Sequence, residues 1–366
     1  MERLRVLHII PTLQTGGAQG VATNLACLLD RSRFQVGVCS LYDSGGSTLD
    51  RVLTNQGLRV WHLGKRRGFD YRMLFEIGRV LTDFRPVVVH THQYVLRYTL
   101  LPTLLRRIPV LIHTVHTFPS REVGPLGRVV HRMAFRAGLL PVAVCNEVAL
   151  EMRQLYGNCR LEMIPNGIAV ANYGTRSGAG HAGRIVFVCV ANLTRPKNYP
   201  LLLEAFAAGP AKFPNVRLDI AGDGALRAEL EEQASALNIA GKVRFLGACA
   251  NVPAVLAAAD VFVLASDWEG RPLSLMEAMA AGKAAICTKV GGIAELIRHN
   301  SDGILVERGD REALAASMVA LYKDLALRTR LGKEAARRAA AEFDASRMAE
   351  GYARLYEERV RRGGSR

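Results

Sequence analysis

Two carboxylates stand eight positions apart in the segment Glu269-Gly-Arg-Pro-Leu-Ser-Leu-Met-Glu277. The preceding run Val261-Phe-Val-Leu-Ala265 is typical of a buried strand, and residues 274–281 are typical of a helix. The amino end of that helix would lie at the strand's carboxyl end, where free N–H groups and partial positive charge suit an anion. Carboxylates do not bind phosphate but accept hydrogen bonds from sugar hydroxyls. Together these features indicate a site for a nucleotide-sugar.

A different interpretation of Glu277 is an ordinary solvated helix residue, as most glutamates are. The residues that follow it, Ala-Met-Ala-Ala-Gly282, are apolar or small. An exposed helix face is therefore less expected at this position, and the binding interpretation is kept beside the solvated one.

A second group that could do chemistry is cationic, in the run Val190-Ala-Asn-Leu-Thr-Arg-Pro-Lys-Asn198. Cleavage of a glycosyl phosphate bond places negative charge on the departing diphosphate. Fixed cations such as Arg195 and Lys197 can stabilise that charge without a metal ion. Without the surrounding pattern, solvated charges before a helix would be the favoured interpretation of these two side chains.

Glycine turns recur where a strand is followed by a helix. Thr15-Gly-Gly-Ala18 follows the first expected strand, and Gly16 and Gly17 would let the backbone approach a ligand beside a helix amino end. The turn is not G-x-G-x-x-G, and no acidic residue ends the second strand, which argues against dinucleotide binding. A simple tight turn is the other interpretation of this loop. Similar turns occur at Gly222-Asp-Gly224 and at Val290-Gly-Gly-Ile-Ala-Glu295.

Four histidines, His90, His92, His113 and His116, fall near two consecutive expected strands. His90 and His92 would share one face of their strand. No cysteine or carboxylate pattern joins them, so we expect no metal site and place His90 and His113 in the core or at helix caps.

Length and composition indicate a two-domain globular protein. The chain has 366 residues, of which 49% are hydrophobic and 22% charged.

Of its net charge of +15, the first 170 residues carry +10, from 21 Lys and Arg against 11 Asp and Glu. Basic residues at 127–137 alternate with apolar ones, a pattern that suits anionic lipid heads or a diphosphate-linked acceptor; a generally basic surface is the alternative. No nucleic-acid-binding pattern accompanies the charge.

The seven cysteines form no C-x-x-C pair and fit buried positions in a reducing cytoplasm. No apolar run is long enough to span a membrane, and residues 4–10 are a first strand rather than a signal peptide.

Strand-like and helix-like runs alternate along the chain, which predicts doubly wound parallel sheets. A Gly/Ser-rich linker is expected at 171–183. From Asp310 the chain is almost wholly helical, with a break at Phe343-Asp344. Expected strands are 4–10, 35–41, 58–62, 86–90, 109–115, 139–144, 161–164, 184–191, 215–221, 243–246, 260–265 and 284–288, and expected helices of the first half are 18–30, 47–56, 70–83, 94–106 and 127–137.

In their order and spacing, these segments together resemble the retaining glycosyltransferases of family 4, the "glycosyl transferases group 1" family. The segment 269–277 is similar to the E-x7-E signature of that family. The remaining resemblance lies in Thr15–Ala18, Val115-His116, Ile164-Pro-Asn-Gly-Ile168, Val190–Asn198, Ile220–Gly224, Val243–Gly247 and Val290–Glu295.

The resemblance implies an α/β chain of the GT-B fold, with two Rossmann-like domains that face a cleft. Residues 1–168 would bind the acceptor and residues 169–344 the nucleotide-sugar. The last helix, 345–366, would return to the first domain.

The same resemblance implies roles for individual residues. His116 would position the transferred sugar, Lys197 would hold the diphosphate and Glu269 would bind the sugar hydroxyls. Asn192 stands where the family has an arginine, so Arg195 would supply the missing guanidinium from another backbone position. The whole expected nucleotide-sugar site comprises Gly16, Gly17, Asn192, Arg195, Lys197, Glu269, Gly270, Arg271, Pro272, Leu273, Ser274 and Glu277.

We therefore expect an enzyme that transfers a sugar from a nucleotide-diphosphate sugar to an acceptor hydroxyl with retention of configuration, without a metal or other cofactor. Polysaccharide or lipid-linked glycan biosynthesis is the expected setting. We further expect a cytoplasmic location with peripheral contact at the inner face of the cytoplasmic membrane. A nucleotide-sugar 2-epimerase of the same fold and a non-catalytic nucleotide-sugar binding protein are the alternatives.

Overall fold

The computed structural model describes residues 3–14, 16–157, 159–174, 183–249 and 251–363. The chain divides into two compact units: unit 1 comprises Met1–Gly167 and Ala345–Arg366, and unit 2 comprises Ile168–Asp344. This division places Ile168 in unit 2, one residue from the boundary expected from the sequence. Most of the expected linker, residues 175–182, lies outside the described residues.

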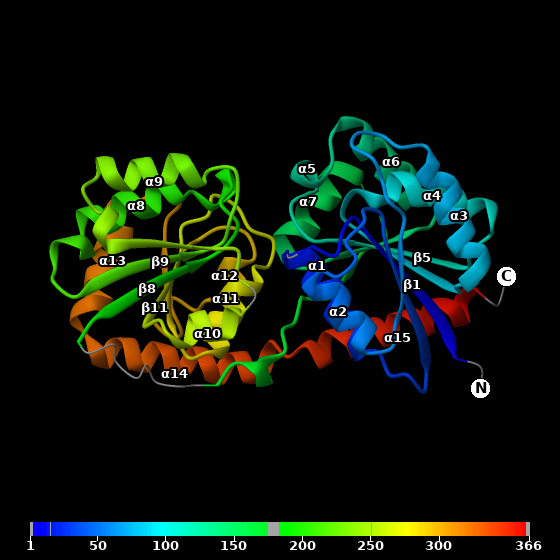
Figure 1. The fold of residues 1–366 in the computed structure, drawn as a ribbon. Coiled ribbons are helices and arrows are strands. Elements are labelled where there is room, and N and C mark those ends of the chain that lie inside the picture. The colour runs from blue at the N-terminus through cyan, green and yellow to red at the C-terminus, as the bar shows by residue number, and fades with distance from the viewer. Residues whose placement is uncertain (1–2, 15, 158, 175–182, 250, 364–366) are drawn as a thin grey trace. The chain divides into compact units, whose positions relative to one another are not determined.

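The core of unit 1 is a seven-stranded sheet in which every strand pair is parallel, in the order β3-β2-β1-β4-β5-β6-β7 (Figure 1). The first strand was predicted correctly, but β4 lies two residues later than 86–90. Pro86 has no N–H group to donate to a neighbouring strand. The hydrogen-bonded pairing of β4 therefore starts after Pro86 and extends to His92. The strands are β1 (Leu4–Ile10), β2 (Phe34–Ser40), β3 (Arg59–His62), β4 (Val88–His92), β5 (Val110–Val115), β6 (Leu140–Ala143) and β7 (Glu162–Met163).

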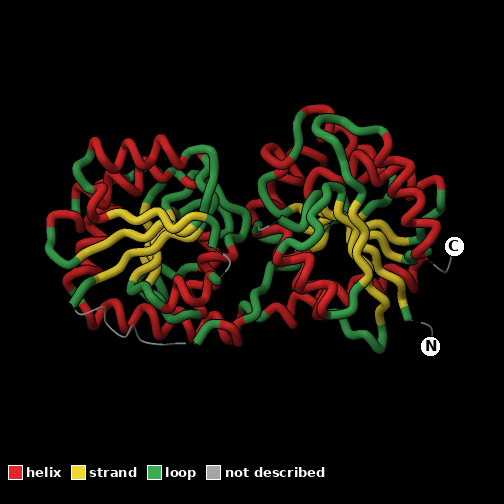
Figure 2. The backbone as a smooth tube through the Cα atoms, in the orientation of Figure 1, coloured by secondary structure: helices red, strands yellow, loops and turns green. Residues whose placement is uncertain are grey.

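Helices cover both faces of this sheet, as Figure 2 shows for the red segments around the yellow strands. The last helix, α15, packs on α1 and β5, so the carboxyl-terminal segment belongs to unit 1. Neither α5 nor α7 was predicted from the sequence. The helices are α1 (Gly17–Leu28), α2 (Thr48–Asn55), α3 (Arg72–Phe84), α4 (Leu96–Leu105), α5 (Pro119–Glu122), α6 (Pro125–Arg136), α7 (Asn146–Tyr156) and α15 (Ala345–Gly363), with a 3-10 turn η1 (Gln93–Val95).

Unit 2 repeats this architecture with six parallel strands in the order β10-β9-β8-β11-β12-β13. Five of them were predicted from the sequence. The sixth, β13, has only three residues, too few to show an alternating pattern. The strands are β8 (Ile185–Val190), β9 (Val216–Ala221), β10 (Val243–Gly247), β11 (Val261–Leu264), β12 (Ala284–Thr288) and β13 (Ile304–Val306).

In Figure 1, α8 and α9 cover one face of this sheet, and α10, α11 and α14 cover the other. The predicted break at Phe343-Asp344 separates α14 from α15, but a second break at Asp324 was missed. Asp324 caps α14 by accepting a hydrogen bond from the Leu327 N–H, so a new helix begins there. The helices are α8 (Tyr199–Ala208), α9 (Arg227–Ala236), α10 (Val252–Ala257), α11 (Leu273–Ala280), α12 (Ile293–Leu296), α13 (Arg311–Lys323) and α14 (Leu325–Glu342), with 3-10 turns η2 (Val170–Asn172), η3 (Arg195–Lys197), η4 (Pro210–Lys212) and η5 (Ala240–Lys242).

No helix in the described part of the chain combines the length and apolar character that a membrane span requires. None of the seven cysteines, all of which are described, forms a disulfide, and Cys39, Cys145, Cys189 and Cys287 are buried. The expectation that cysteines act as small core residues therefore holds for these four.

Candidate functional site

The site of unit 2 is built where β8 and β11, neighbours in the sheet, end side by side. The loop after each strand is joined to the other: the Asp267 N–H donates to the Pro196 carbonyl at 2.8 Å. The Asn198 side-chain amide donates to the Asp267 carboxylate at 3.2 Å. Asn198 also adopts a left-handed conformation and caps α8. These contacts bring the loop that carries Lys197 against the loop that carries Glu269.

Lys197 and Glu269 form an ion pair at this junction. The Lys197 ammonium lies 2.5 Å from Glu269 Oε1, and that oxygen also accepts a hydrogen bond from the Ser266 hydroxyl at 2.8 Å. Only 8% of Glu269 is exposed, and Ser266 is fully buried. The pair is therefore largely removed from water, which strengthens the attraction and fixes the carboxylate in one orientation.

The turn at Gly291-Gly292, predicted from the sequence, supports Glu269 from behind. The Gly292 N–H donates to the Glu269 carbonyl at 3.3 Å. Gly291 has φ +51°, and a Cβ there would lie 1.8 Å from the same carbonyl oxygen. Only glycine fits this position, because any side chain would displace the Glu269 backbone.

The helix α11 begins at Leu273, directly after the Glu269 loop, one residue earlier than predicted. Pro272 occupies its N-cap position, and no side chain caps this end in the described structure. The first N–H groups, including those of Leu273 and Ser274, are therefore directed out of the helix and suit an anion. Gly270 is buried next to them, and the Arg271 guanidinium lies 5.5 Å from the centre of the Phe343 ring.

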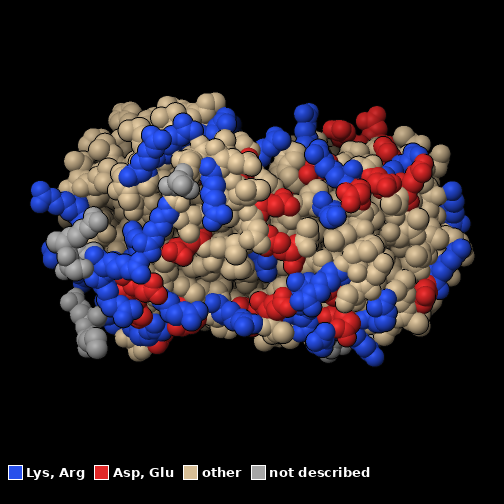
Figure 3. All heavy atoms as spheres, turned by 180° about the vertical axis from the view of Figure 1, so that it is seen from behind, with Lys and Arg blue, Asp and Glu red and all other residues tan. Residues whose placement is uncertain are grey.

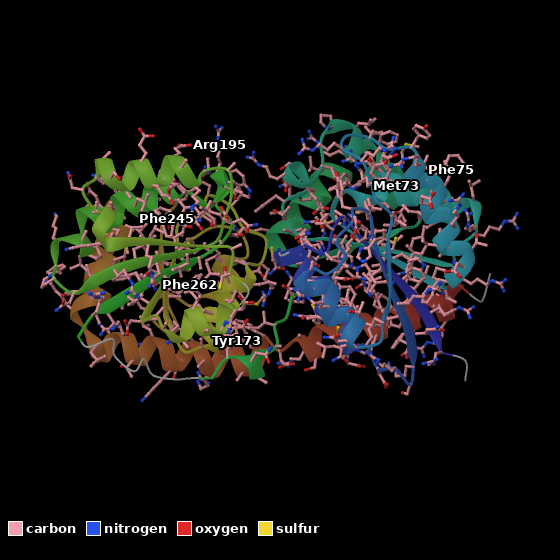
Figure 4. All side chains as sticks on the ribbon, in the orientation of Figure 1. Met73, Phe75, Tyr173, Arg195, Phe245 and Phe262 are labelled. Atoms are coloured by element: carbon pink, nitrogen blue, oxygen red, sulfur yellow. The ribbon has the colours of Figure 1, made fainter. Side chains whose placement is uncertain are left out.

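Glu277 lies within α11 and is largely shielded from solvent. The Tyr173 phenol forms a hydrogen bond with its carboxyl group. Burial raises the pKa of Glu277 above its usual range, and the hydrogen bond from Tyr173 opposes that shift. The partial burial of Glu277 and its bond with Tyr173 favour the binding interpretation over the solvated one. Figure 4 shows Tyr173 on the segment that leads into unit 2, and it lines a cavity with Asn251 and Ala281.

Asn192 and Arg195 are exposed on the loop after β8. Figure 4 shows Arg195 at the surface of unit 2, so it is accessible to a ligand. The loop is held by Gly222 and Gly224: a Cβ at either glycine would lie within 2.4 Å of the carbonyl of Ala191 or Leu193. The predicted glycine turn after β9 thus supports the loop backbone.

In unit 1, Gly16 and Gly17 lie at the amino end of α1, after β1, as predicted. Gly16 is the N-cap residue, and no side chain caps α1 in the described structure. A Cβ at Gly17 would meet no atom within 4 Å, so local packing does not require glycine there. Thr15 lies outside the described residues.

The four histidines of the sequence analysis divide between the two faces of the sheet, because successive strand residues point in opposite directions. His92 Nδ1 lies 2.9 Å from His116 Nε2 on one face. On the other face His113 lies 2.8 Å from the Thr91 hydroxyl and 3.4 Å from Glu122. His90 and His113 are both fully buried, as predicted.

Two family models match the chain. The model described as "Glycosyltransferase Family 4" matches residues 15–172, and the model described as "Glycosyl transferases group 1" matches residues 176–338. Together the two matches span both groups of predicted site residues. The chain belongs to the family 4 glycosyltransferases.

Relatives of this glycosyltransferase include the putative glycosyltransferase EpsD of Bacillus subtilis, 35% identical over 171 residues, which are 47% of this chain and 45% of EpsD. In that alignment the chain spans about half the length of its relative. The UDP-Gal:alpha-D-GlcNAc-diphosphoundecaprenol alpha-1,3-galactosyltransferase of Escherichia coli is 26% identical over 280 residues, 70% of this chain and 72% of that protein. Anabaena HepE, solved with UDP and glucose, superposes with a TM-score of 0.85 over 97% of this chain and 100% of HepE, at 22% identity. That likeness shows the GT-B fold.

Several residues of the candidate site were not singled out from the sequence. Ser266 and Asp267 lie close to Glu269, but a serine or aspartate after a strand is too common to signal a role. Tyr173 was assigned only to a linker. The signal available in the sequence was that Tyr173 is an aromatic residue in a stretch of otherwise small and polar residues.

Proposed function

We propose that this glycosyltransferase moves a sugar from a nucleotide-diphosphate sugar to an acceptor hydroxyl with retention of anomeric configuration. The observation that carries the proposal is the ion pair of Lys197 with the buried carboxylate of Glu269, beside the uncapped amino end of α11. A cation and free N–H groups suit a diphosphate, and the carboxylate suits sugar hydroxyls.

The proposed roles follow from this arrangement. Lys197, Arg195 and the backbone N–H groups between Gly270 and Ser274, apart from Pro272, which has none, hold the diphosphate and stabilise its charge as it departs. Glu269 accepts hydrogen bonds from the donor sugar, and Glu277 from the ribose. Because these groups supply the positive charge that the leaving group needs, the proposed reaction requires no metal or other cofactor.

Retention is proposed to occur by attack on the face from which the diphosphate leaves. The acceptor oxygen bonds to the anomeric carbon, the bond from that carbon to the phosphate oxygen breaks, and the acceptor proton passes to the phosphate. Glu269 is poorly suited to act as a nucleophile, because its ion pair with Lys197 and the hydrogen bond from Ser266 lower the nucleophilicity of the carboxylate. His116 of unit 1 contacts the transferred sugar in this proposal.

Thermal unfolding with UDP, GDP, ADP and their sugars tests the donor class in the wild type, in Glu277→Ala and in Glu307→Ala. Glu307 is an exposed glutamate of the same unit and serves as the matched control. A ligand at 100 times its Kd adds about 2.7 kcal/mol to the folded state. The uridine compounds are tested first, since HepE was solved with UDP and the relative from Escherichia coli uses UDP-Gal. No shift with any nucleotide would contradict the proposal.

Product analysis then separates transfer from the alternatives. An epimerised nucleotide-sugar formed without acceptor would indicate a 2-epimerase. Tight donor binding without turnover across lipid-linked and soluble acceptors would indicate a binding protein, an alternative that Asn192 keeps open.

We further propose that unit 1 meets its acceptor at an anionic membrane surface through an apolar–basic face of α6 and the adjacent α4. Leu126, Val129 and Met133 of α6 are 78%, 52% and 64% exposed and share one side of the helix. Arg128, Arg132 and Arg136 are interspersed with them, and in Figure 3 basic side chains outnumber acidic ones over unit 1. The neighbouring α4 adds Leu101, Leu104 and Leu105, all more than half exposed. An exposed apolar surface with surrounding arginines suits anionic lipid.

A further inference from the structure

Three histidines of unit 1 form a continuous hydrogen-bonded chain. His116 Nε2 lies 2.9 Å from His92 Nδ1, and His92 Nε2 lies 3.2 Å from His8 Nδ1. His8 is on β1, His92 ends β4 and His116 follows β5. The register aligns His8 with His90, two positions before His92, so the parallel sheet brings the three rings to one face.

Two nitrogen atoms at the ends of this chain have no partner. His8 Nε2 and His116 Nδ1 are both buried and without a hydrogen bond in the described structure. His8 is fully buried within the sheet, whereas His116 lies at the carboxyl end of its strand and is partly exposed. Both end atoms are covered in the described structure, but His116 borders the surface, so its Nδ1 is the end that a small side-chain movement would open to a ligand oxygen.

The rings of this chain are neutral near pH 7. Burial lowers the pKa of His8 to about 3 and that of His116 to about 4, and it holds the pKa of His92 well below its usual range. A neutral imidazole has one N–H and one acceptor nitrogen. Each contact then needs one donor and one acceptor, so all three rings must point their N–H groups in the same direction along the chain.

The burial of His8 selects the direction. If the protons pointed toward His8, its Nε2–H would be a donor deep in the sheet that no ligand could pair, which is costly, whereas an N–H at His116 Nδ1 can be paired when a ligand binds. With the opposite direction His8 donates to His92, and His92 donates to His116. His116 Nδ1 then carries the proton at the end nearer the surface, where a ligand oxygen can accept it.

A metal ion is the competing occupant, since the ring nitrogens of His8, His90 and His92 lie within 4.8 Å of one another. However, both nitrogens of His90 already have partners at 2.7 Å, the hydroxyls of Tyr356 and Thr114. Thr114 is in turn 2.7 Å from the Tyr352 hydroxyl. Coordination by His90 would break one of these bonds, so the hydrogen-bonded chain accounts better for the geometry.

We propose that His92 and His8 are positioning residues that hold His116 in the tautomer protonated at Nδ1, from which it donates a hydrogen bond to an oxygen of the donor sugar. The second half of this inference rests on the proposed function of His116. The first half is a property of unit 1 alone and is tested without substrate.

NMR of the whole chain labelled with 15N-histidine measures the tautomer directly, because protonated and unprotonated ring nitrogens have well separated shifts. We expect His116 to be protonated at Nδ1 in the wild type. His92→Leu removes the donor and should give a mixture of tautomers, whereas His92→Gln keeps an amide donor and should preserve the wild-type state. His8→Val, which removes the donor to His92, is a second variant in case His92→Leu fails to fold. His131→Gln, on the opposite face, is the control.

Kinetics test the link to transfer. We expect His92→Leu to lower kcat about tenfold with little change in the KM of the donor, and His92→Gln to restore most of the rate. Three results would contradict the proposed row of hydrogen-bonded histidines. These are protonation of His116 at Nε2, an unchanged tautomer in His92→Leu, and one tightly bound metal ion per purified protein molecule. Full activity of His116→Ala would contradict the hydrogen bond from His116 to the donor sugar. Absence of nucleotide binding by the wild type would instead contradict the proposed function.

Discussion

The ammonium group of Lys197 lies 2.5 Å from the carboxylate of Glu269, although the two residues are 72 positions apart in the chain. The contact exists because β8 and β11 are adjacent in the sheet and their following loops are joined. It places the two proposed donor-binding charges at one point.

The first prediction concerns this pair. Lys197→Met should lower kcat by about 10²- to 10³-fold, because a fixed charge that stabilises the leaving group is lost. It should also lower the free energy of unfolding by about 1–3 kcal/mol, since Glu269 keeps its burial but loses its partner. Glu269→Gln in the same background should recover part of the stability but none of the rate. Steady-state kinetics and urea unfolding check both; equal stability of the single and double variants would contradict the coupling.

The second prediction concerns the backbone of Gly291. Gly291→Ala should lower the free energy of unfolding by well above the roughly 1–2 kcal/mol that a left-handed conformation alone costs a residue with a side chain. The added Cβ would lie 1.8 Å from the Glu269 carbonyl oxygen. Gly309→Ala is the matched control, with φ +78° and open space around the added Cβ. Urea unfolding should show the larger loss at Gly291, together with weaker nucleotide binding. Similar losses at both glycines would show that the close approach does not matter.

The third prediction follows from the raised pKa of Glu277. An ionised carboxylate accepts hydrogen bonds from both ribose hydroxyls, so nucleotide affinity should fall as the pH drops through this raised pKa. Tyr173→Phe removes the hydrogen bond that favours ionisation and should shift the fall to higher pH. Calorimetric titration with nucleotide between pH 5 and 8 measures the shift. An unchanged profile would separate Glu277 from binding.

The fourth prediction is that unit 1 loses stability in mild acid. Burial lowers the pKa of His8 and of His113 to about 3, while an unfolded imidazole titrates near 6.5. The unfolded chain therefore binds more protons below pH 6.5, and stability present above that pH is lost as the pH falls. At pH 5 each ring that stays neutral in the fold costs about 2 kcal/mol.

The two tryptophans separate the units in this experiment. Trp61 lies in β3 of unit 1, and Trp268 precedes Glu269 in unit 2. In Trp268→Phe the remaining Trp61 reports on unit 1, and its fluorescence should show a steep loss of stability between pH 6.5 and 5. In Trp61→Phe the remaining Trp268 reports on unit 2 and should show a shallow loss. Equal slopes would contradict the assignment to buried histidines.

The fifth prediction concerns the apolar–basic face of α6. Leu126→Ser with Met133→Ser should reduce flotation with vesicles that contain anionic lipid, because the apolar side chains no longer insert. Neutral vesicles should bind the wild type weakly. Leu325→Ser, an exposed leucine of unit 2, is the control. Unchanged flotation of the double variant would reject this face as the docking surface.

Much of the fold follows from local patterns. Short apolar runs and glycine turns predicted β1, β8 and the strand–turn–helix unit from β11 to α11. The pattern was insufficient for β13, which is too short, and for the end of β4, which depends on where pairing with β1 and β5 begins.

The sequence by itself determined the residue types of the site: a carboxylate pair, a lysine beside a turn, and glycines where the backbone must pass closely. Only the tertiary structure decided that Lys197 and Ser266 share one oxygen of Glu269, that Tyr173 contacts Glu277, and that His8 and His92 are linked to His116. These contacts join residues far apart in sequence, and the register of parallel strands sets them. That register is specified by the packing of the whole sheet rather than by any local run of residues.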